Sequence, residues 1–204
     1  PAIDRGDFEL TFDVRDGVAR YISTMTPMTQ ARGSGRIEGP SFGFVLESGM
    51  IGDIESAGGD VSIPRLERGG DSFITAQGRG QVPELLGLIN QPPFQYLDRY
   101  GVAPEGFSGA ADITLSIQRP LLEFFDQNRI EYTVDGTFTD TSAPFTFGPL
   151  GLTDADVTVT GGKEGLFVSG PVNLGPWRAN LNWEERYGQN GEPTRYRLSG
   201  PMTR

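Results

Sequence analysis

The feature that most constrains this chain is a two-residue alternation of apolar and polar side chains, which returns from one end to the other. It is clear in segments 8–14, 111–117, 130–134 and 177–183. Successive side chains of a β-strand point to opposite faces of the sheet, so each segment predicts a strand with one apolar and one polar face. We count about ten to twelve such segments in the chain. They predict a mainly β protein built on a large antiparallel sheet with one face in water.

Turn residues are abundant enough to separate that many strands. The chain has 29 glycines and 15 prolines among 204 residues, well above ordinary usage. Asp16-Gly17 predicts a hairpin turn after the first strand, and Gly58-Gly59-Asp60 predicts a turn that precedes another strand. The polar stretch at 29–34 predicts a loop.

Part of the chain has helical spacing instead. The apolar residues of 82–89 recur every three or four positions, behind a proline and a glutamate that are typical of a first helical turn. Apolar residues at the same spacing continue after the prolines at 92–93. The pattern predicts one or two short helices within residues 82–100. Pro120 precedes another candidate helix at 121–127. We expect these helices to be insertions in a single β-rich domain that covers residues 1–204.

Charge and composition exclude several classes of function. The chain carries 17 basic and 27 acidic residues, and a net charge of -10 argues against a nucleic-acid partner. It has no cysteine and no histidine, so it lacks thiolate and imidazole metal ligands and the commonest general base. We therefore expect neither a metal site nor a cofactor. The first five residues are no signal peptide and resemble the cut edge of a larger protein, so we expect a fragment of a longer polypeptide.

Carboxylate pairs are the remaining catalytic option. The close pairs are Glu123 with Asp126, Asp154 with Asp156, and Glu184 with Glu185. A glycosidase needs two carboxylates that face each other across a cleft, usually from different strands, and sequence neighbours do not supply that arrangement. The segments around Asp60, around Asp71 and at 153–156 also lack the series of oxygen ligands found in a calcium-binding loop. We expect these acids to lie in turns and on the surface.

Several short segments occur in an order that is found in one known family. They are Gly6–Val14, Gly33–Gly39, Phe42–Phe44, Gly80–Leu86, the Pro-Pro-Phe step at 92–94, Tyr100-Gly101, Phe107–Gly109, Pro120-Leu121, Leu152–Ala155 and Leu166–Gly170. In order and spacing they resemble the AsmA-like proteins that carry the DUF3971 region, the YhdP-like group of cell-envelope proteins in Gram-negative bacteria. The resemblance covers nearly the whole chain.

The resemblance implies a fold and a function. The sheet would be curved, in the form of a groove that carries phospholipid acyl chains across the periplasm between the inner and outer membranes. The full-length protein would be attached to the inner membrane through an N-terminal anchor that lies outside these residues, and the partners would be a phospholipid or other lipid and the remainder of the same polypeptide. The resemblance carries no catalytic motif, so we expect no enzyme.

Apolar strand positions are the candidate contacts for lipid, because acyl chains are held by apolar area alone. The candidates are Phe8, Leu10, Phe12, Phe42, Phe44, Leu46, Ile113, Leu115, Ile117, Trp177, Leu181 and Trp183. If the same residues were sealed inside a closed core, the chain would be a non-catalytic structural or interaction domain. A carbohydrate-active enzyme is a third hypothesis, which requires a polar cleft with two facing carboxylates.

Overall fold

The described part of the chain folds into eleven strands and one short α-helix. The computed structural model describes residues 8–21, 24–92, 95, 97–98, 103–122, 129–147, 150–187 and 194–201. Its strands are β1 (Glu9–Ala19), β2 (Met28–Glu38), β3 (Ser41–Ile51), β4 (Ile54–Ile63), β5 (Asp71–Gln81), β6 (Ser108–Pro120), β7 (Glu131–Phe147), β8 (Leu150–Gly162), β9 (Gly165–Leu174), β10 (Trp177–Arg186) and β11 (Arg195–Ser199).

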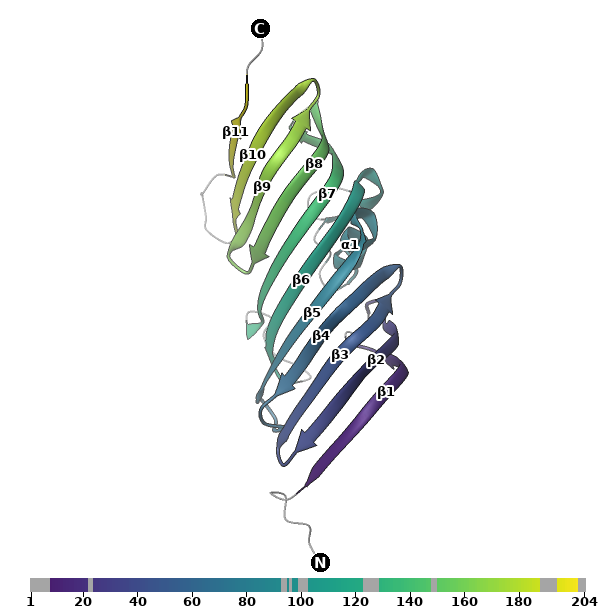
Figure 1. The fold of residues 1–204 in the computed structure, drawn as a ribbon. Helices are drawn as coiled ribbons and strands as arrows, with labels where there is room; N and C mark the ends of the chain where they lie inside the picture. The colour runs from purple at the N-terminus through teal and green to yellow at the C-terminus, as the bar shows by residue number, and fades with distance from the viewer. Residues whose placement is uncertain are drawn as a thin grey trace, which may run out of the picture. The chain divides into compact units, whose positions relative to one another are not determined.

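The strands form one antiparallel sheet in which each strand pairs with its neighbours in sequence. The order is β1 to β11 without a crossover, and β1 and β11 do not pair, so the sheet is not closed into a barrel (Figure 1). Short turns are sufficient to connect antiparallel neighbours, which is why a chain so rich in glycine and proline adopts this order. The predicted fold class, a mainly β protein with a large antiparallel sheet, is confirmed.

Contacts divide the chain into two compact units. The first unit comprises Pro1–Gly78 and Thr114–Thr133, and the second comprises Arg79–Ile113 and Val134–Arg204. Strands β5, β6 and β7 each contribute residues to both units. That residues 1–204 act as one domain stays a prediction.

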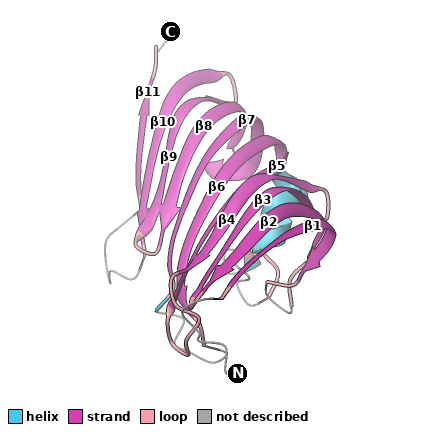
Figure 2. Ribbon diagram, turned by 60° about the horizontal axis from the view of Figure 1, so that its bottom comes forward, coloured by secondary structure: helices cyan, strands magenta, loops and turns pink. Residues whose placement is uncertain are grey.

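In the first unit, the register places apolar positions of β1, β2, β3 and β4 side by side. One row across these strands consists of Phe12, Gly35, Phe44 and Val61. The next row consists of Leu10, Ile37, Phe42 and Ile63 in the same strand order. These strands are bent along their length (Figure 2).

The second unit has a buried core. Its buried members are Leu152, Ala155, Val157, Val172, Leu174 and Leu181. They come from β8, β9 and β10, and partly buried residues that include Phe138, Val159 and Trp183 pack around them. Burial of side chains of this size contributes about 1.5–3 kcal/mol each, so this cluster is a main source of stability in the second unit.

The predicted helix at 82–89 is present as α1 (Val82–Ile89), which follows β5 directly (Figures 1 and 2). Pro83 lies in its first turn, where the absent N–H costs no hydrogen bond. Val82 and Leu85 are its buried residues. A 3₁₀ turn, η2, follows at Pro104–Gly106. Most of the expected helices near 94–100 and 121–127 lies outside the described residues, and no described helix is long and apolar enough to cross a bilayer.

Three local predictions are wrong, all at glycine-rich or polar positions. Asp16-Gly17 is not a hairpin turn but an irregularity inside β1, where Asp16 has a φ of 55° and the register with β2 shifts. Residues 29–34 are part of β2 and not a loop. Gly58–Asp60 lies within β4, and the turn from β3 to β4 is at Gly52 instead, with a φ of 60°.

Packing explains why these glycines occur in strands. A Cβ at Gly59 would collide with the backbone oxygen of Thr75 in β5. At Gly33, a Cβ would collide with the backbone of β3 and lie 2.8 Å from Cζ of Phe44. The glycines therefore serve close approach between strands, a role that glycine also has outside turns.

Candidate functional site

The most continuous apolar surface of the first unit is formed by three phenylalanines and the aliphatic residues beside them. We call it the phenylalanine face, and its members are Leu10, Phe12, Val14, Ile37, Phe42, Phe44, Leu46, Val61 and Ile63. The Phe12 ring centroid lies 6.5 Å from that of Phe42 and 6.3 Å from that of Phe44, with the rings stacked at small angles. Offset aromatic pairs at such separations attract beyond their area burial.

Glycines in β2 make room for these rings. A Cβ at Gly35 would overlap the ring of Phe12, which lies directly over it, and Gly33 has the same relation to Phe44. The absence of side chains at Gly33 and Gly35 therefore brings rings from β1 and β3 together above β2. The sequence analysis missed this role, because a glycine that accommodates a ring from a neighbouring strand has the same local signature as a turn.

The phenylalanine face is only partly buried. Leu10 is 44% exposed, and Phe12, Phe42, Phe44 and Leu46 are partly buried. All strands of the described residues belong to one sheet, so no second sheet covers this face. Apolar side chains of this face are therefore partly exposed in the part of the chain that the structure describes.

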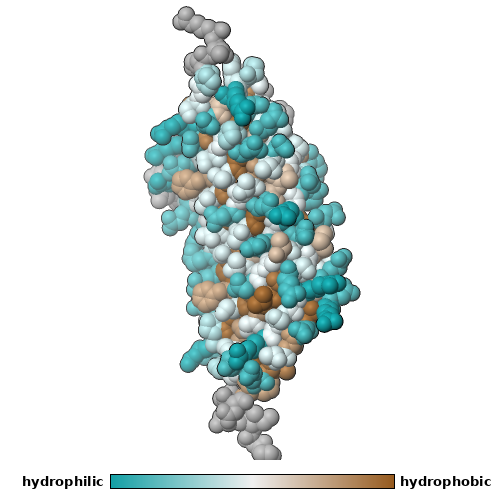
Figure 3. Space-filling model, in the orientation of Figure 1, coloured by the Kyte–Doolittle hydropathy of each residue, from teal (hydrophilic) through white to brown (hydrophobic). Residues whose placement is uncertain are grey.

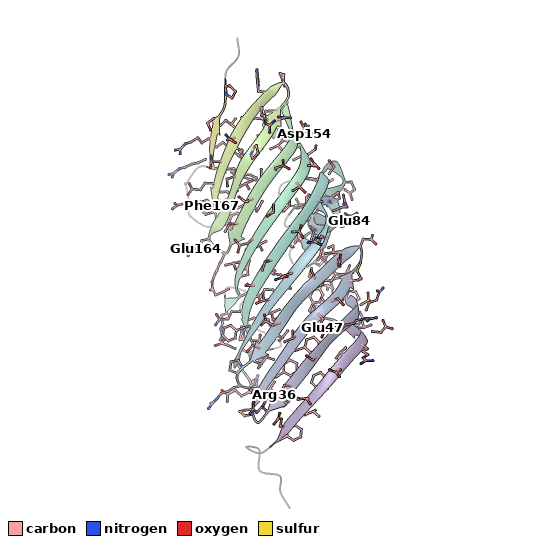
Figure 4. All side chains as sticks on the ribbon, in the orientation of Figure 1. Arg36, Glu47, Glu84, Asp154, Glu164 and Phe167 are labelled. Atoms are coloured by element: carbon pink, nitrogen blue, oxygen red, sulfur yellow. The ribbon has the colours of Figure 1, made fainter. Side chains whose placement is uncertain are left out.

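The opposite side of the same strands is polar and bears ion pairs. Arg36 (labelled in Figure 4) contacts Glu9 at 3.3 Å and Glu38 at 3.0 Å, and all three side chains are more than half exposed. Exposed pairs of this kind contribute little to stability. Val45, next to Phe44 in sequence, is 55% exposed. The face drawn in Figure 3 has hydrophobic side chains as separate spots among hydrophilic ones.

A shallow hollow of about 500 Å³ lies over the middle of β1 to β4. Three consecutive residues of each strand line it, at 11–13, 34–36, 43–45 and 60–62. Gly43 contributes to its size, since a Cβ built there would meet nothing within 4 Å. The lining mixes apolar, hydroxyl and charged side chains and contains no pair of carboxylates on adjacent positions.

Two further candidates, Leu115 and Ile117, lie in the part of β6 that belongs to the first unit. The N–H of Leu121 donates to the oxygen of Gly70 at 2.8 Å, and Oγ of Ser72 donates to the oxygen of Arg119 at 3.0 Å. Both Leu115 and Ile117 are partly buried apolar residues.

The remaining candidates belong to the second unit and have three different environments. Leu181 is 1% exposed and lies in the buried core, and Trp177 is 60% exposed at the start of β10. Trp183 is partly buried and stacks on Tyr196 of β11, with ring centroids 5.8 Å apart. Ile113 is partly buried beside Gly136. The structure thus brings five candidates into the phenylalanine face, namely Leu10, Phe12, Phe42, Phe44 and Leu46. Phe8 lies directly before β1 and is 43% exposed, and the candidates of the second unit are not gathered in the same way.

Three members of the acidic pairs named in the sequence analysis accept hydrogen bonds from neighbouring residues. Asp154 accepts a hydrogen bond from Asn173 at 2.9 Å, and Asp156 accepts one from the backbone N–H of Asp140 at 3.1 Å. Glu184 accepts from Arg186 at 2.8 Å. Glu123 and Asp126 lie outside the described residues. Within the part of the chain that the structure describes, no group of three or more metal-binding side chains occurs.

Two tyrosines have perturbed pKa values. Burial raises the pKa of Tyr21, whose hydroxyl donates to the backbone oxygen of Thr26 at 2.8 Å. Burial, and secondarily the carboxylate of Glu185, raise the pKa of Tyr196. Both shifts reflect the cost of placing a charged phenolate in partly buried surroundings.

Comparison with known proteins found no match to a family model, to a curated protein or to a solved structure.

Proposed function

We propose that this chain is a periplasmic segment of an AsmA-like protein and that it binds phospholipid acyl chains on the phenylalanine face. In a full-length protein attached to the inner membrane, such a surface would conduct lipid between the inner and outer membranes. The role would be non-catalytic. The order of segments that resembles the AsmA-like, DUF3971-containing group supports the family part of this proposal.

One observation carries the binding part: the stacked rings of Phe12, Phe42 and Phe44 lie on a sheet face that no second sheet of the described residues covers. Acyl chains make no hydrogen bonds, so only apolar area can hold them. Removing about 200 Å² of apolar surface from water contributes about 5 kcal/mol at about 25 cal/mol per Å². That is enough for reversible binding, which transport requires.

The uncharged character of the phenylalanine face also supports the proposal. Its members are hydrocarbon side chains from β1, β2, β3 and β4, and the charged residues of the same strands, such as Glu9 and Arg36, alternate to the opposite side. A buried charge in the path of an acyl chain would cost several kcal/mol. The alternation keeps such charges away from the proposed path.

A structural or interaction domain is the second candidate function. The closed core of the second unit favours it, because Leu181 and its neighbours are buried in the manner of an ordinary scaffold. On this hypothesis the phenylalanine face would be covered by protein in the assembled molecule and would take no lipid.

Lipid binding to a matched pair of variants distinguishes these functions. Phe44→Asp places a charge on the phenylalanine face, whereas Val45→Asp places the same charge one residue away on the opposite side, where the native side chain is exposed. We expect native mass spectrometry to detect phospholipid bound to the gently purified wild-type chain. A fluorescent fatty acid should bind Phe44→Asp at least about tenfold more weakly, a loss of about 1.4 kcal/mol, and Val45→Asp about as well as wild type.

Circular dichroism and thermal unfolding serve as the control for folding of both variants. Absence of lipid from the wild type, or equal binding by both folded variants, would reject the lipid proposal and leave the structural domain.

A further inference from the structure

The polar side of the second unit bears an exposed aromatic side chain. Phe167 on β9 (labelled in Figure 4) is 50% exposed. Its neighbours in sequence, Leu166 and Val168, are partly buried, and Val168 packs against the buried core of this unit. Successive side chains of a strand point to opposite faces, so Phe167 lies on the face of β9 that is turned away from the core.

The register surrounds Phe167 with polar side chains. Thr160 of β8 and Glu184 of β10 are directly paired with Phe167. Two positions further along β9, Ser169 is exposed and is likewise paired with polar residues of β8 and β10. Side chains at paired positions lie on the same face of a sheet. The phenyl ring of Phe167 is therefore set among hydrogen-bonding groups.

A row of polar side chains crosses four strands at the level of Ser169. From β8 to β11 the row consists of Thr158, Ser169, Asn182 and Arg197. Oγ1 of Thr158 and Oγ of Ser169 are 3.0 Å apart and share a hydrogen bond, which orients both hydroxyls. Neighbouring strands are about 4.8 Å apart, which is close to the length of one sugar unit in an extended glycan. Each successive sugar can thus meet one donor or acceptor of the row.

Positive charge is in excess at this place in an acidic chain. Arg195 of β11 is paired with Glu184, and Arg197 is paired with Asn182. The carboxylate of Glu184 accepts a hydrogen bond from Nε of Arg186 at 2.8 Å, so its charge is already shared with another guanidinium. Guanidinium groups therefore outnumber carboxylates here, although the net charge of the chain is -10. Charge complementarity favours an anionic ligand.

An exposed ring beside hydroxyl and amide groups matches the chemistry of a sugar. A pyranose with equatorial substituents has C–H groups on its faces, and their contact with Phe167 removes apolar area from water. The hydroxyls at the edge of the pyranose remain free to bond to Ser169 and Asn182. A protein partner fits less well, since the centre of a protein interface is rich in apolar side chains and the neighbours of Phe167 are polar.

We propose that Phe167 and the polar residues beside it bind an extended acidic glycan. We call this site the Phe167 surface, and its members are Thr158, Phe167, Ser169, Asn182, Arg195 and Arg197. One sugar ring lies on Phe167, and carboxylates of the glycan lie beside the guanidinium groups, which can bind them through two parallel hydrogen bonds. The site is separate from the phenylalanine face and does not depend on lipid binding there.

Two oligosaccharides with the same backbone provide the first test. The β-1,4-linked mannuronate hexamer and β-1,4-linked mannohexaose differ in the carboxylate of each sugar unit. Calorimetric titration of the wild-type chain at low salt should show at least about fivefold tighter binding of the mannuronate hexamer. Raising salt from about 50 to about 500 mM should remove most of this preference by screening. Absence of binding by the mannuronate hexamer, or equal binding of both at low salt, overturns the proposal.

Hexaglutamate separates recognition of a glycan from attraction of any polyanion. It carries one carboxylate per unit, as the mannuronate hexamer does, but has no sugar rings. We expect it to bind at least about fivefold more weakly than the mannuronate hexamer, because it lacks the ring contact with Phe167. Equal binding would show that the surface responds to charge alone and would reject a glycan site.

The ring contact is tested by Phe167→Ala, which should weaken binding of the mannuronate hexamer at least about fivefold. The matched control is Phe73→Ala, the same substitution at a 40% exposed phenylalanine of β5 in the first unit. We expect this control to bind as the wild type does. An affinity of folded Phe167→Ala equal to that of the control contradicts the proposed contact.

The charge contact is tested by Arg197→Gln, which should reduce the preference for the mannuronate hexamer over mannohexaose about threefold or more. Arg178→Gln is the matched control, because it removes the same charge from an exposed position of β10 that is paired with Asn173, away from Ser169. We expect the control to keep the preference of the wild type. Equal preferences in the two folded variants would overturn the role of Arg197.

Circular dichroism reports whether each variant folds, and a measurement on the wild type replaces any variant that does not. Backbone amide resonances are recorded by NMR while the mannuronate hexamer is added. The largest shifts should occur at Thr158, Phe167, Ser169 and Asn182. Shifts concentrated elsewhere in the chain, or none, would reject the Phe167 surface as the binding site.

Discussion

The ring of Phe12 occupies the space in which a Cβ of residue 35 would lie. Phe12 on β1 and Gly35 on β2 are directly paired, and the ring extends over the glycine toward Phe42 and Phe44 of β3. Gly35 thus determines how the phenylalanine face is packed, although it contributes no side chain to it.

The first prediction concerns this glycine. Gly35→Ala should destabilise the chain by about 1–3 kcal/mol, because the added methyl group must displace the ring of Phe12. Denaturant unfolding measures the change, and lipid affinity of the same variant reports whether the rings have moved.

Gly43→Ala is the matched control. It lies on the adjacent strand β3, and a Cβ there meets nothing within 4 Å. Since the substitution also lowers the entropy of the unfolded chain, we expect a change within about 0.5 kcal/mol of zero or a slight gain in stability. Equal destabilisation by both substitutions would show that Phe12 does not lie over Gly35.

The second prediction compares an open apolar surface with a closed core. Leu181 is 1% exposed, and Leu181→Ala should cost about 2–5 kcal/mol through lost burial and the cavity left behind. Leu10 is 44% exposed, and Leu10→Ala should cost less than about 1.5 kcal/mol. Denaturant midpoints of the two variants give the comparison, and similar costs would mean that Leu10 is covered in solution.

Much of the fold follows from local pattern. Alternation in 8–14, 111–117 and 177–183 predicts strands that the structure contains, and the polar face of each segment predicts the antiparallel sheet in which they lie. Helix α1 is also predicted by the sequence, because proline and glutamate in a first turn and apolar residues at helical spacing are local signals.

The errors arise at residues whose conformation or burial depends on a partner that is distant in sequence. Gly33 and Gly35 lie in a strand because rings from β1 and β3 need their space, and nothing in the segment itself reveals those rings. Likewise, Leu181 and Trp177 share a strand and an apolar pattern, but one is buried and the other is 60% exposed. Alternation in the sequence predicts only the side of the sheet on which an apolar residue lies. Whether that residue is buried depends on packing between strands.

The third prediction concerns the ionisation of Tyr196. Burial, and secondarily Glu185, raise the pKa of Tyr196 above its ordinary value of 10.0. Its phenolate absorbance should therefore appear at higher pH in the folded chain than in the unfolded chain. The difference spectrum between wild type and Tyr196→Phe isolates this residue from the five other tyrosines, since the chain has 6 in all.

The same shift sets the sign of a pH effect on stability. The folded state holds the Tyr196 proton more tightly than the unfolded state does, so the contribution is fully present below pH 10 and is lost as pH rises through the folded-state pKa. We expect the wild type to lose more stability than Tyr196→Phe in that alkaline range. Glu185→Gln removes the nearby negative charge and should move the transition to lower pH, while burial beside Trp183 keeps part of the shift. A transition at the ordinary pH in the folded wild type would mean that β11 does not hold Tyr196 against β10.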